Sequence, residues 1–201
     1  MQKRIFCGVG EFDIPVIHPI EFDGNTQFVG FNYLQTCKTP EEKGLHFFVD
    51  DYQFNRIWTN IDKYVFHLMR FRYVMSPDFS TYTDFPKAVQ IYNHYRKHWV
   101  GAYLQEAGVK VIPTISWGDE SSFAWCFDGE PERSTVSVSS VGCMNSQEKR
   151  KLFLHGYNAM IERLNPEKII FYGDVPDECR GNIVRINSFQ DKFKEVVCSG
   201  W

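Results

Sequence analysis

The chain has 201 residues, of which 43% are hydrophobic and 23% charged, a composition typical of a globular domain with a buried core. A net charge of -3 and an isoelectric point near 6.1 exclude a global basic field and argue against tight, sequence-independent binding to nucleic acid. No run approaches the roughly 18 apolar residues of a membrane helix, and glycines and acids interrupt the start before a signal-peptide core could form. We therefore expect one cytoplasmic domain over residues 1–201, with no membrane segment.

The first third of the chain predicts short strands around one helical region. Residues 1–27 are rich in Gly, Pro and Asp, which predicts an irregular lead-in. Short apolar runs bounded by turn residues predict strands at 28–33 and 45–49. Between 52 and 70 the apolar positions recur every three or four residues, which predicts one helix or two short helices separated by a bend. A third strand is expected at 73–75.

The rest of the chain continues the alternation of helices and strands. Pro86 suits the first turn of a helix, and the apolar pattern runs on to a stop at Gly108, which makes this the longest predicted helix. Asn145 and Glu148 have the spacing of a capping pair for a helix over 146–164. The remaining elements are strands at 109–115, 135–141, 168–172 and 182–186 and a tail helix over 188–201.

This alternation is typical of parallel βαβ units, so the predicted fold class is α/β. Six or seven strands are compatible with a reduced or incomplete TIM-like (β/α) barrel or with an open doubly wound sheet. Polar residues follow at least four of the strands, as they would if all the loops met at one mouth, whereas an open sheet concentrates its site at one switch point. We therefore favour the barrel.

Acidic residues that follow the predicted strands are the candidate catalytic groups: Asp50, Asp78, Asp119 and Asp174. Clustered carboxylates raise the pKa of at least one member and can supply an acid and a base. Two such groups flanking a bond are the minimal machinery of a glycoside or nucleoside hydrolase. Asp51 and Asp119 precede helical segments, so a role in helix capping is an equal alternative for them. Asp78 is distant from any helix start, and its alternative role is to organise a turn.

Aromatic and polar residues beside these acids are the candidate ligand-binding groups: Asp51, Tyr82, Arg96, Trp117, Glu120, Ser121 and Tyr172. Sugars and bases stack on aromatic rings while carboxylates accept from their hydroxyl or amino groups, so the expected ligand is a nucleotide, nucleoside or sugar. No glycine-rich phosphate cradle of the G-x-x-x-x-G-K type is present. Hard divalent cations also bind carboxylates, so Asp50, Asp78 and Asp174 are the candidate metal ligands, and no other cofactor is predicted.

The histidines and cysteines give little support for a zinc site. His94 and His98 stand four residues apart on the longest predicted helix, a spacing that zinc enzymes use. Tyr95 occupies the place of the glutamate in H-E-x-x-H, so we expect both histidines to be exposed. The six cysteines contain no C-x-x-C pair, which excludes a zinc ribbon and predicts reduced thiols.

Several blocks of the sequence resemble the bacterial and phage family known as domain of unknown function 4417. The blocks are HFFVDDYQFNRIW from His46, SPDFSTYTDFP from Ser76, IYNHYRKHWVGAYLQ from Ile91, VIPTISWGDESSF from Val111, FDGEP from Phe127 and YGD from Tyr172. The resemblance implies a phage or mobile-element context but no activity.

Two functional hypotheses follow from the acids, the aromatics and the resemblance. The first is a hydrolase or transferase that acts on a glycosidic-type bond in a nucleotide, nucleoside or sugar. The second is a non-catalytic phage accessory protein, acting against host defence, that sequesters a small nucleotide or binds a host protein. Either would work in the host cytoplasm.

Overall fold

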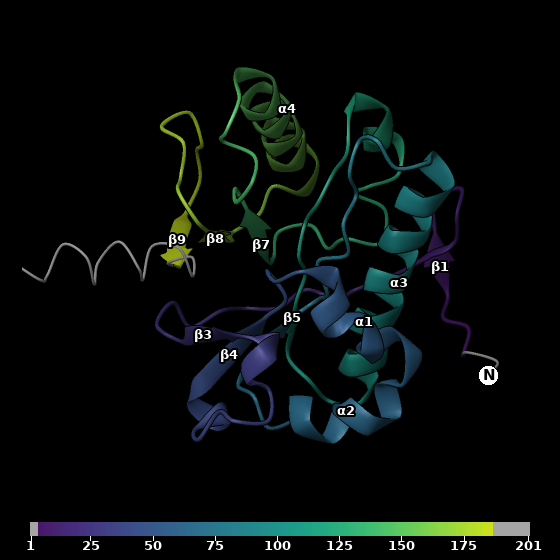
Figure 1. The fold of residues 1–201 in the computed structure, drawn as a ribbon, viewed down its shortest axis with the longest axis vertical. Coiled ribbons are helices and arrows are strands. Elements are labelled where there is room, and N and C mark those ends of the chain that lie inside the picture. The colour runs from purple at the N-terminus through teal and green to yellow at the C-terminus, as the bar shows by residue number, and fades with distance from the viewer. Residues whose placement is uncertain (1–3, 187–201) are drawn as a thin grey trace, which may run out of the picture.

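The computed structural model describes residues 4–186, which form a mixed α/β fold of parallel sheets and four α-helices (Figure 1). The strands are β1 (Gly8–Val9), β2 (Ile14–Pro15), β3 (Gln27–Gly30), β4 (Lys43–His46), β5 (Tyr73–Met75), β6 (Val111–Ile112), β7 (Thr135–Ser139), β8 (Lys168–Tyr172) and β9 (Ile183–Ile186). The helices are α1 (Asp51–Thr59), α2 (Ile61–Leu68), α3 (Lys87–Glu106) and α4 (Gln147–Leu164), with short 3-10 turns η1 (Phe31–Tyr33), η2 (Pro40–Glu42) and η3 (Glu120–Ala124).

The strands of the described residues form three sheets. β1 and β2 make a small antiparallel hairpin within the predicted irregular lead-in. β3, β4, β5 and β6 form a parallel sheet in chain order, and β7, β8 and β9 form a second parallel sheet, also in chain order. A single parallel bridge between Thr114 and Ser137 links the two sheets at the β6–β7 junction.

The structure does not show the predicted TIM-like barrel. Within residues 4–186 no ladder joins β9 back to β3, and both strands remain partly exposed, so the sheets do not close. The alternative of a doubly wound sheet does not fit either, because the strand order in the two larger sheets follows the chain and never reverses.

Both faces of the inner parallel strands, such as β5 and β8, are buried, as expected for strands connected by helices. Along β5, Val74 faces the core under α1, α2 and α3, while Tyr73 and Met75 face the opposite side. Along β8, Phe171 packs under α4, and Ile170 joins the same opposite side as Met75. The two sheets therefore share one apolar core on their inner face while each has its own helices outside.

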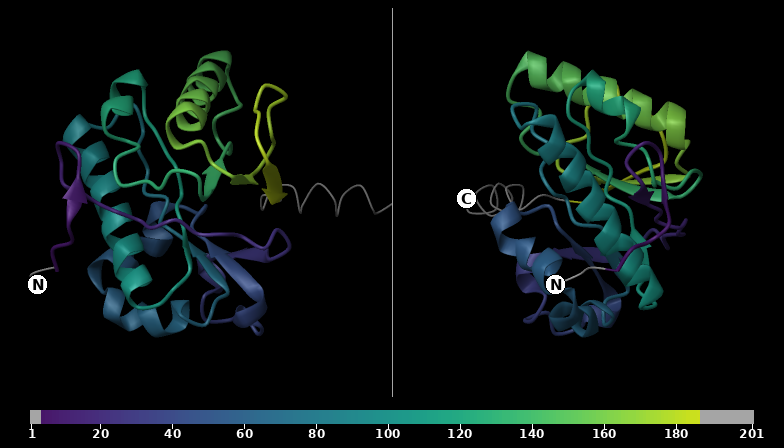
Figure 2. Two further views of the ribbon diagram at one scale, coloured as in Figure 1. Left: turned by 180° about the vertical axis from the view of Figure 1, so that it is seen from behind. Right: turned by 90° about the vertical axis from the view of Figure 1, so that its right-hand side faces the viewer.

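α3 contacts α1 and β6, on the side of the first sheet, and also packs against the apolar cluster under α4. It runs from the α4 side to the α1–α2 side of the molecule, and the β1–β2 hairpin packs against it (Figure 2). The predicted limits at Pro86 and Gly108 hold, because Pro86 is its N-cap and Gly108 adopts a positive φ of 85° just after its end. Within the described residues, none of the helices has the length and apolarity needed to cross a membrane.

Three further predictions concern the limits and number of the other helices, and their outcomes differ. The region from 52 to 70 is two helices, α1 and α2, which meet at Asn60. The cap of α4 is Ser146 instead of Asn145, since the Ser146 hydroxyl accepts from the Lys149 N–H. The predicted tail helix over 188–201 lies outside the described residues.

Candidate functional site

A cleft of about 430 Å³ opens where strands of both sheets end. Its walls come from the segments that follow β4 and β5 and from the ends of β7 and β8. The lining residues are Phe48, Val49, Asp50, Asp51, Tyr52, Asp78, Ser80, Tyr82, Phe85, Ser139, Val141 and Tyr172. Because the carboxyl ends of parallel strands point the same way, loops from distant parts of the chain meet here. The volume lies within the range of roughly 300–1,000 Å³ typical of small-molecule sites.

Asp78 is the most unusual group in the cleft. Its side chain is only partly exposed, and within residues 4–186 its carboxyl makes no hydrogen bond or ion pair at contact distance. Burial raises the pKa of Asp78 to about 6, the charge of Lys97 opposes the rise, and the charge of Asp51 adds to it. Near neutral pH this carboxyl therefore exchanges a proton readily, which is what a general acid or base requires.

Asp51 is held in a set of contacts that suits a carboxylate anion. It accepts from the Ser80 amide at 3.2 Å and from the Ser80 hydroxyl at 2.8 Å, and it lies 3.8 Å from the Arg96 guanidinium. These contacts join the start of α1 to the loop after β5, so Asp51 shapes the cleft wall instead of capping α1. Asp50 is the N-cap residue, but its exposed side chain makes no capping hydrogen bond.

Arg96 lies behind this wall and outside the cleft lining. Its guanidinium donates to the Asn55 side chain at 2.7 Å and stacks on the Phe79 ring, with its central carbon 3.6 Å from the ring centroid. Phe79 is buried and follows Asp78 directly in the chain. Arg96 therefore connects Asp51 to the loop of Asp78 and does not line the cleft, and its contact with a ligand stays a prediction.

Aromatic rings accompany the acids of the cleft. Phe48 and Tyr172, which both line it, stack with ring centroids 4.8 Å apart, and the buried His46 lies at the same distance from Tyr172 outside the lining. This contact bridges the two sheets, because His46 ends β4 and Tyr172 ends β8. At the rim, Tyr52 and Tyr82 are 79% and 62% exposed, which leaves their rings available to a ligand.

The acids after β6 do not reach the cleft. Asp119 accepts from the Ser121 amide and hydroxyl at 3.0 and 2.6 Å and is the N-cap of η3, so the capping alternative is confirmed for this residue. Glu120 and Ser121 are exposed on the same turn. Trp117 packs against Phe153 with ring centroids 5.4 Å apart and belongs to the core under α4.

Asp174 also lies outside the cleft lining. Its side chain is 69% exposed and pairs with Arg185 at 2.6 Å. Of the three acids predicted to hold a divalent metal, Asp50 and Asp78 line the cleft and Asp174 does not. The structure therefore brings together Asp50, Asp51, Asp78, Tyr82 and Tyr172 from the predicted set.

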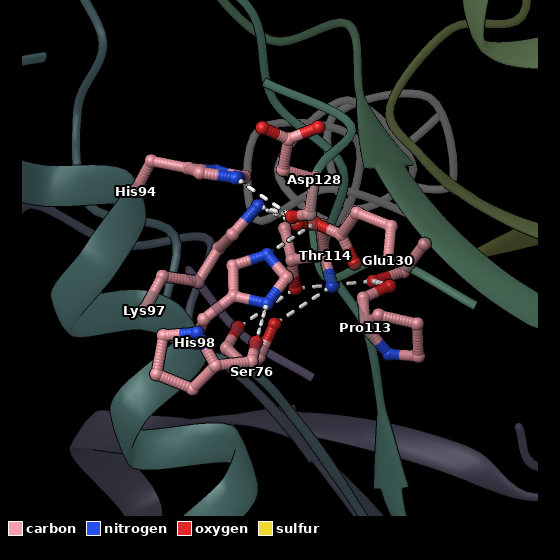
Figure 3. A network of polar contacts seen from close by, with 10 residues as sticks. Ser76, His94, Lys97, His98, Pro113, Thr114, Asp128 and Glu130 are labelled. Carbon is pink, nitrogen blue, oxygen red and sulfur yellow. Dashed lines mark hydrogen bonds and ion pairs between the residues drawn. The ribbon is translucent and has the colours of Figure 1, made fainter. Parts of the chain in front are cut away.

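The expectation that His94 and His98 are exposed is wrong. They are 1% and 0% exposed, and their rings contact the Asp128 carbonyl, the Pro15 carbonyl of β2 and the Glu130 side chain (Figure 3). Glu130 lies between them and Lys97: its Oε1 accepts from Lys97 Nζ at 2.7 Å and contacts His98 Nε2 at 2.9 Å. Burial would raise the pKa of Glu130, but the charges and hydrogen bonds of Lys97 and His98 lower it below its ordinary value.

This buried network continues into the junction of the two sheets. Lys97 Nζ also donates to the Thr114 carbonyl at 2.8 Å. The Thr114 hydroxyl donates to the Ser76 carbonyl at 2.7 Å and contacts the Ser137 hydroxyl at 3.1 Å. Sequence reasoning missed the network because apolar periodicity says nothing about which loop covers a helix. The sequence did place three basic side chains on one stretch of the predicted helix, and this grouping was the available sign of the network. They are His94, Lys97 and His98.

Comparison with known proteins places the chain among phage proteins without assigning an activity. The pattern of the family described as domain of unknown function 4417 matches residues 6–190. The gene 1 protein of Mycobacterium phage L5 is 36% identical over 181 residues, which cover 86% of this chain and 76% of that protein. The gene 1 protein of Mycobacterium phage D29 is 33% identical over 210 residues, covering 99% and 75%. No solved structure is significantly similar to the chain.

Proposed function

Because the chain belongs to the domain of unknown function 4417 family and resembles mycobacteriophage proteins, we propose that it serves a phage by hydrolysing or transferring a glycosidic-type bond. The ligand in this proposal is a nucleotide, a nucleoside or a sugar bound in the cleft. The observation that carries the proposal is Asp78: a carboxyl with a pKa raised to about 6 and no hydrogen-bond partner among the described residues, facing a cleft with further carboxylates.

The proposal assigns different roles to the acids of the cleft. Asp78, when protonated, donates its proton to the leaving group. Asp50, exposed and without a capping bond, acts as the base or the nucleophile at the anomeric carbon. Asp51, which accepts from the Ser80 hydroxyl and lies 3.8 Å from the Arg96 guanidinium, stabilises the positive charge that develops on the sugar ring. Carboxyl groups in such different surroundings are the usual basis of acid and base roles.

The aromatic residues and the sheets support the choice of ligand class. Tyr52 and Tyr82 offer rings at the rim on which a base or sugar can stack, and Ser80 and Ser139 offer hydroxyls for polar contacts. The shared core around Met75, Ile112 and Ile170 supports the further proposal that the two sheets are parts of one incomplete barrel with a common mouth.

The test is turnover of nucleosides, nucleotides and aryl glycosides, followed by chromatography of the products. We expect Asp78→Asn to lower kcat by about 100-fold or more while ligand binding persists. Asp84→Asn is the matched control, since Asp84 is an exposed acid in the same loop that does not line the cleft. Because the acid must be protonated, kcat/KM should fall as the pH rises through about 6. Equal turnover by Asp78→Asn and the wild type would refute the assignment.

The second candidate is a non-catalytic protein that sequesters a nucleotide or binds a host protein. The observation that favours it is the large exposure of Tyr52 and Tyr82, which suits binding without chemistry. In that case the ligand is bound stoichiometrically without product, Tyr82→Ala loses affinity, and Asp78→Asn keeps it. Because Asp78→Asn keeps binding in both cases, product formation by the wild type separates the two candidates, and isothermal titration measures the loss of affinity in Tyr82→Ala.

A further inference from the structure

The buried cluster of His94, His98 and Glu130 has the composition of a metal site. One donor atom from each residue lies within 4.8 Å of the others, and all three residues are buried (Figure 3). The two histidines occupy successive turns of α3, and Glu130 comes from the segment after η3. Imidazole nitrogens with one carboxylate oxygen form a common ligand set of zinc.

The contacts of His98 require either a proton or a metal ion between its Nε2 and Glu130. The Pro15 carbonyl can only accept, so His98 Nδ1, 2.8 Å away, carries a hydrogen and donates it. His98 Nε2 then faces Glu130 Oε1 at 2.9 Å. A bare ring nitrogen and a carboxylate oxygen would repel each other at this distance, so either a proton or a metal ion joins them. A ligating histidine commonly donates its other N–H to a carbonyl in this manner.

Two atoms in the cluster distinguish a metal ion from a proton. His94 Nε2 lies 3.0 Å from the Asp128 carbonyl and donates to it, which leaves Nδ1 with its lone pair. Within residues 4–186, His94 Nδ1 and Glu130 Oε2 are buried with no hydrogen-bond partner. Buried polar atoms are nearly always bonded, and a proton shared by His98 and Glu130 would leave both of these unsatisfied. A metal ion would satisfy them together.

The surroundings hold the ligands in place. Gly129 has a φ of 76°, and a Cβ there would lie 2.8 Å from His98 Nδ1 and 2.5 Å from the Pro15 carbonyl oxygen, so only glycine lets this segment approach so closely. Lys97 bonds to Glu130 Oε1 and the Thr114 carbonyl, which orients the carboxylate and leaves Oε2 unpaired.

We propose that His94, His98 and Glu130 bind a divalent transition-metal ion of the zinc type, which fastens α3 to residues 128–131. Three protein ligands leave a fourth position for a water molecule. The site is separate from the cleft, shares no residue with its lining and does not depend on the proposed reaction.

The test uses the full chain, stripped with a chelator and then titrated with Zn²⁺ or Co²⁺. We expect one metal ion per chain by elemental analysis, a higher unfolding temperature that chelator reverses, and visible Co²⁺ absorption of the intense four-coordinate kind. His94→Gln should weaken the affinity by at least about 10- to 100-fold, the loss seen when even a supporting partner of a ligand is removed. His155→Gln, at an exposed histidine of α4, is the matched control and should bind as the wild type does.

Three results would overturn the proposal. The first is a wild type that binds no Zn²⁺ or Co²⁺ stoichiometrically, which would mean that a proton joins His98 and Glu130. The second is a Co²⁺ spectrum with an intense thiolate charge-transfer band, which would place the ion at cysteines. The third is unchanged affinity in His94→Gln. The wild-type spectrum decides the question even where a variant fails to fold, and Asp78→Asn should keep full metal stoichiometry whether or not the cleft is catalytic.

Discussion

Asp78 in the cleft and Glu130 in the buried network both lie within reach of the charge of Lys97, yet their pKa values move in opposite directions. Burial dominates at Asp78 and raises its pKa to about 6. At Glu130 the contacts with Lys97 and His98 outweigh burial and lower the pKa. The difference is direct hydrogen bonding, which Glu130 has at 2.7 and 2.9 Å and Asp78 lacks among the described residues.

This contrast separates structural carboxylates from reactive ones. A buried anion with bonded cations holds segments together, because breaking the pair leaves a charge stranded away from water. A carboxyl without partners destabilises the fold in its charged form and is retained where its proton is useful. Replacing each acid by its amide is therefore the direct way to test the comparison.

The largest effect is expected from Glu130→Gln. Removing this charge leaves Lys97 buried at 1% exposure without its counter-ion, which should lower the free energy of unfolding by about 3–5 kcal/mol. Urea unfolding at pH 7 in the presence of chelator measures the loss without any metal contribution. Lys97→Met combined with Glu130→Gln should lose less than the two single changes added together, because the double variant buries no lone charge. A loss below about 1 kcal/mol in the single variant would contradict the pairing.

Asp78→Asn should change stability in the opposite direction. The pKa of the folded state is raised from 3.8 to about 6, so the folded state keeps a proton that the unfolded state has already released. Stability therefore falls as the pH rises from about 4 to 6, by about 2–3 kcal/mol in all. At pH 7.5 the Asn variant should be more stable than the wild type by about the same 2–3 kcal/mol, with the difference vanishing near pH 4. Destabilisation at pH 7.5 would show that the carboxylate has a partner.

The smallest effect is expected at Asp174, which was a predicted catalytic acid. Its ion pair with Arg185 is largely exposed, so Asp174→Asn should alter the free energy of unfolding by less than about 1 kcal/mol. Turnover, once a substrate is known, should stay at the wild-type level because the side chain does not line the cleft. A loss of turnover comparable to that of Asp78→Asn would show that Asp174 takes part in the reaction.

Local patterns in the sequence were enough to predict most elements and part of the site. The strands at Tyr73–Met75 and Lys168–Tyr172 and the limits of α3 follow from apolar runs, Pro86 and Gly108. The cleft collects Asp50 and Asp78 because both follow parallel strands that end at the same edge. The same rule misplaced Asp119 and Asp174, since it ignores local turns and ion pairs that turn a side chain away.

The sequence by itself determined the type and approximate position of most helices and strands, because capping, periodicity and backbone restriction act between residues that are close in the chain. Only the tertiary structure decided which polar side chains are buried and paired. His98 is 83 residues from Pro15 and 32 from Glu130, and no local pattern predicts that those segments close over α3. Burial and pairing are properties of contacts between distant segments, and they set the opposite pKa shifts that distinguish Glu130 from Asp78.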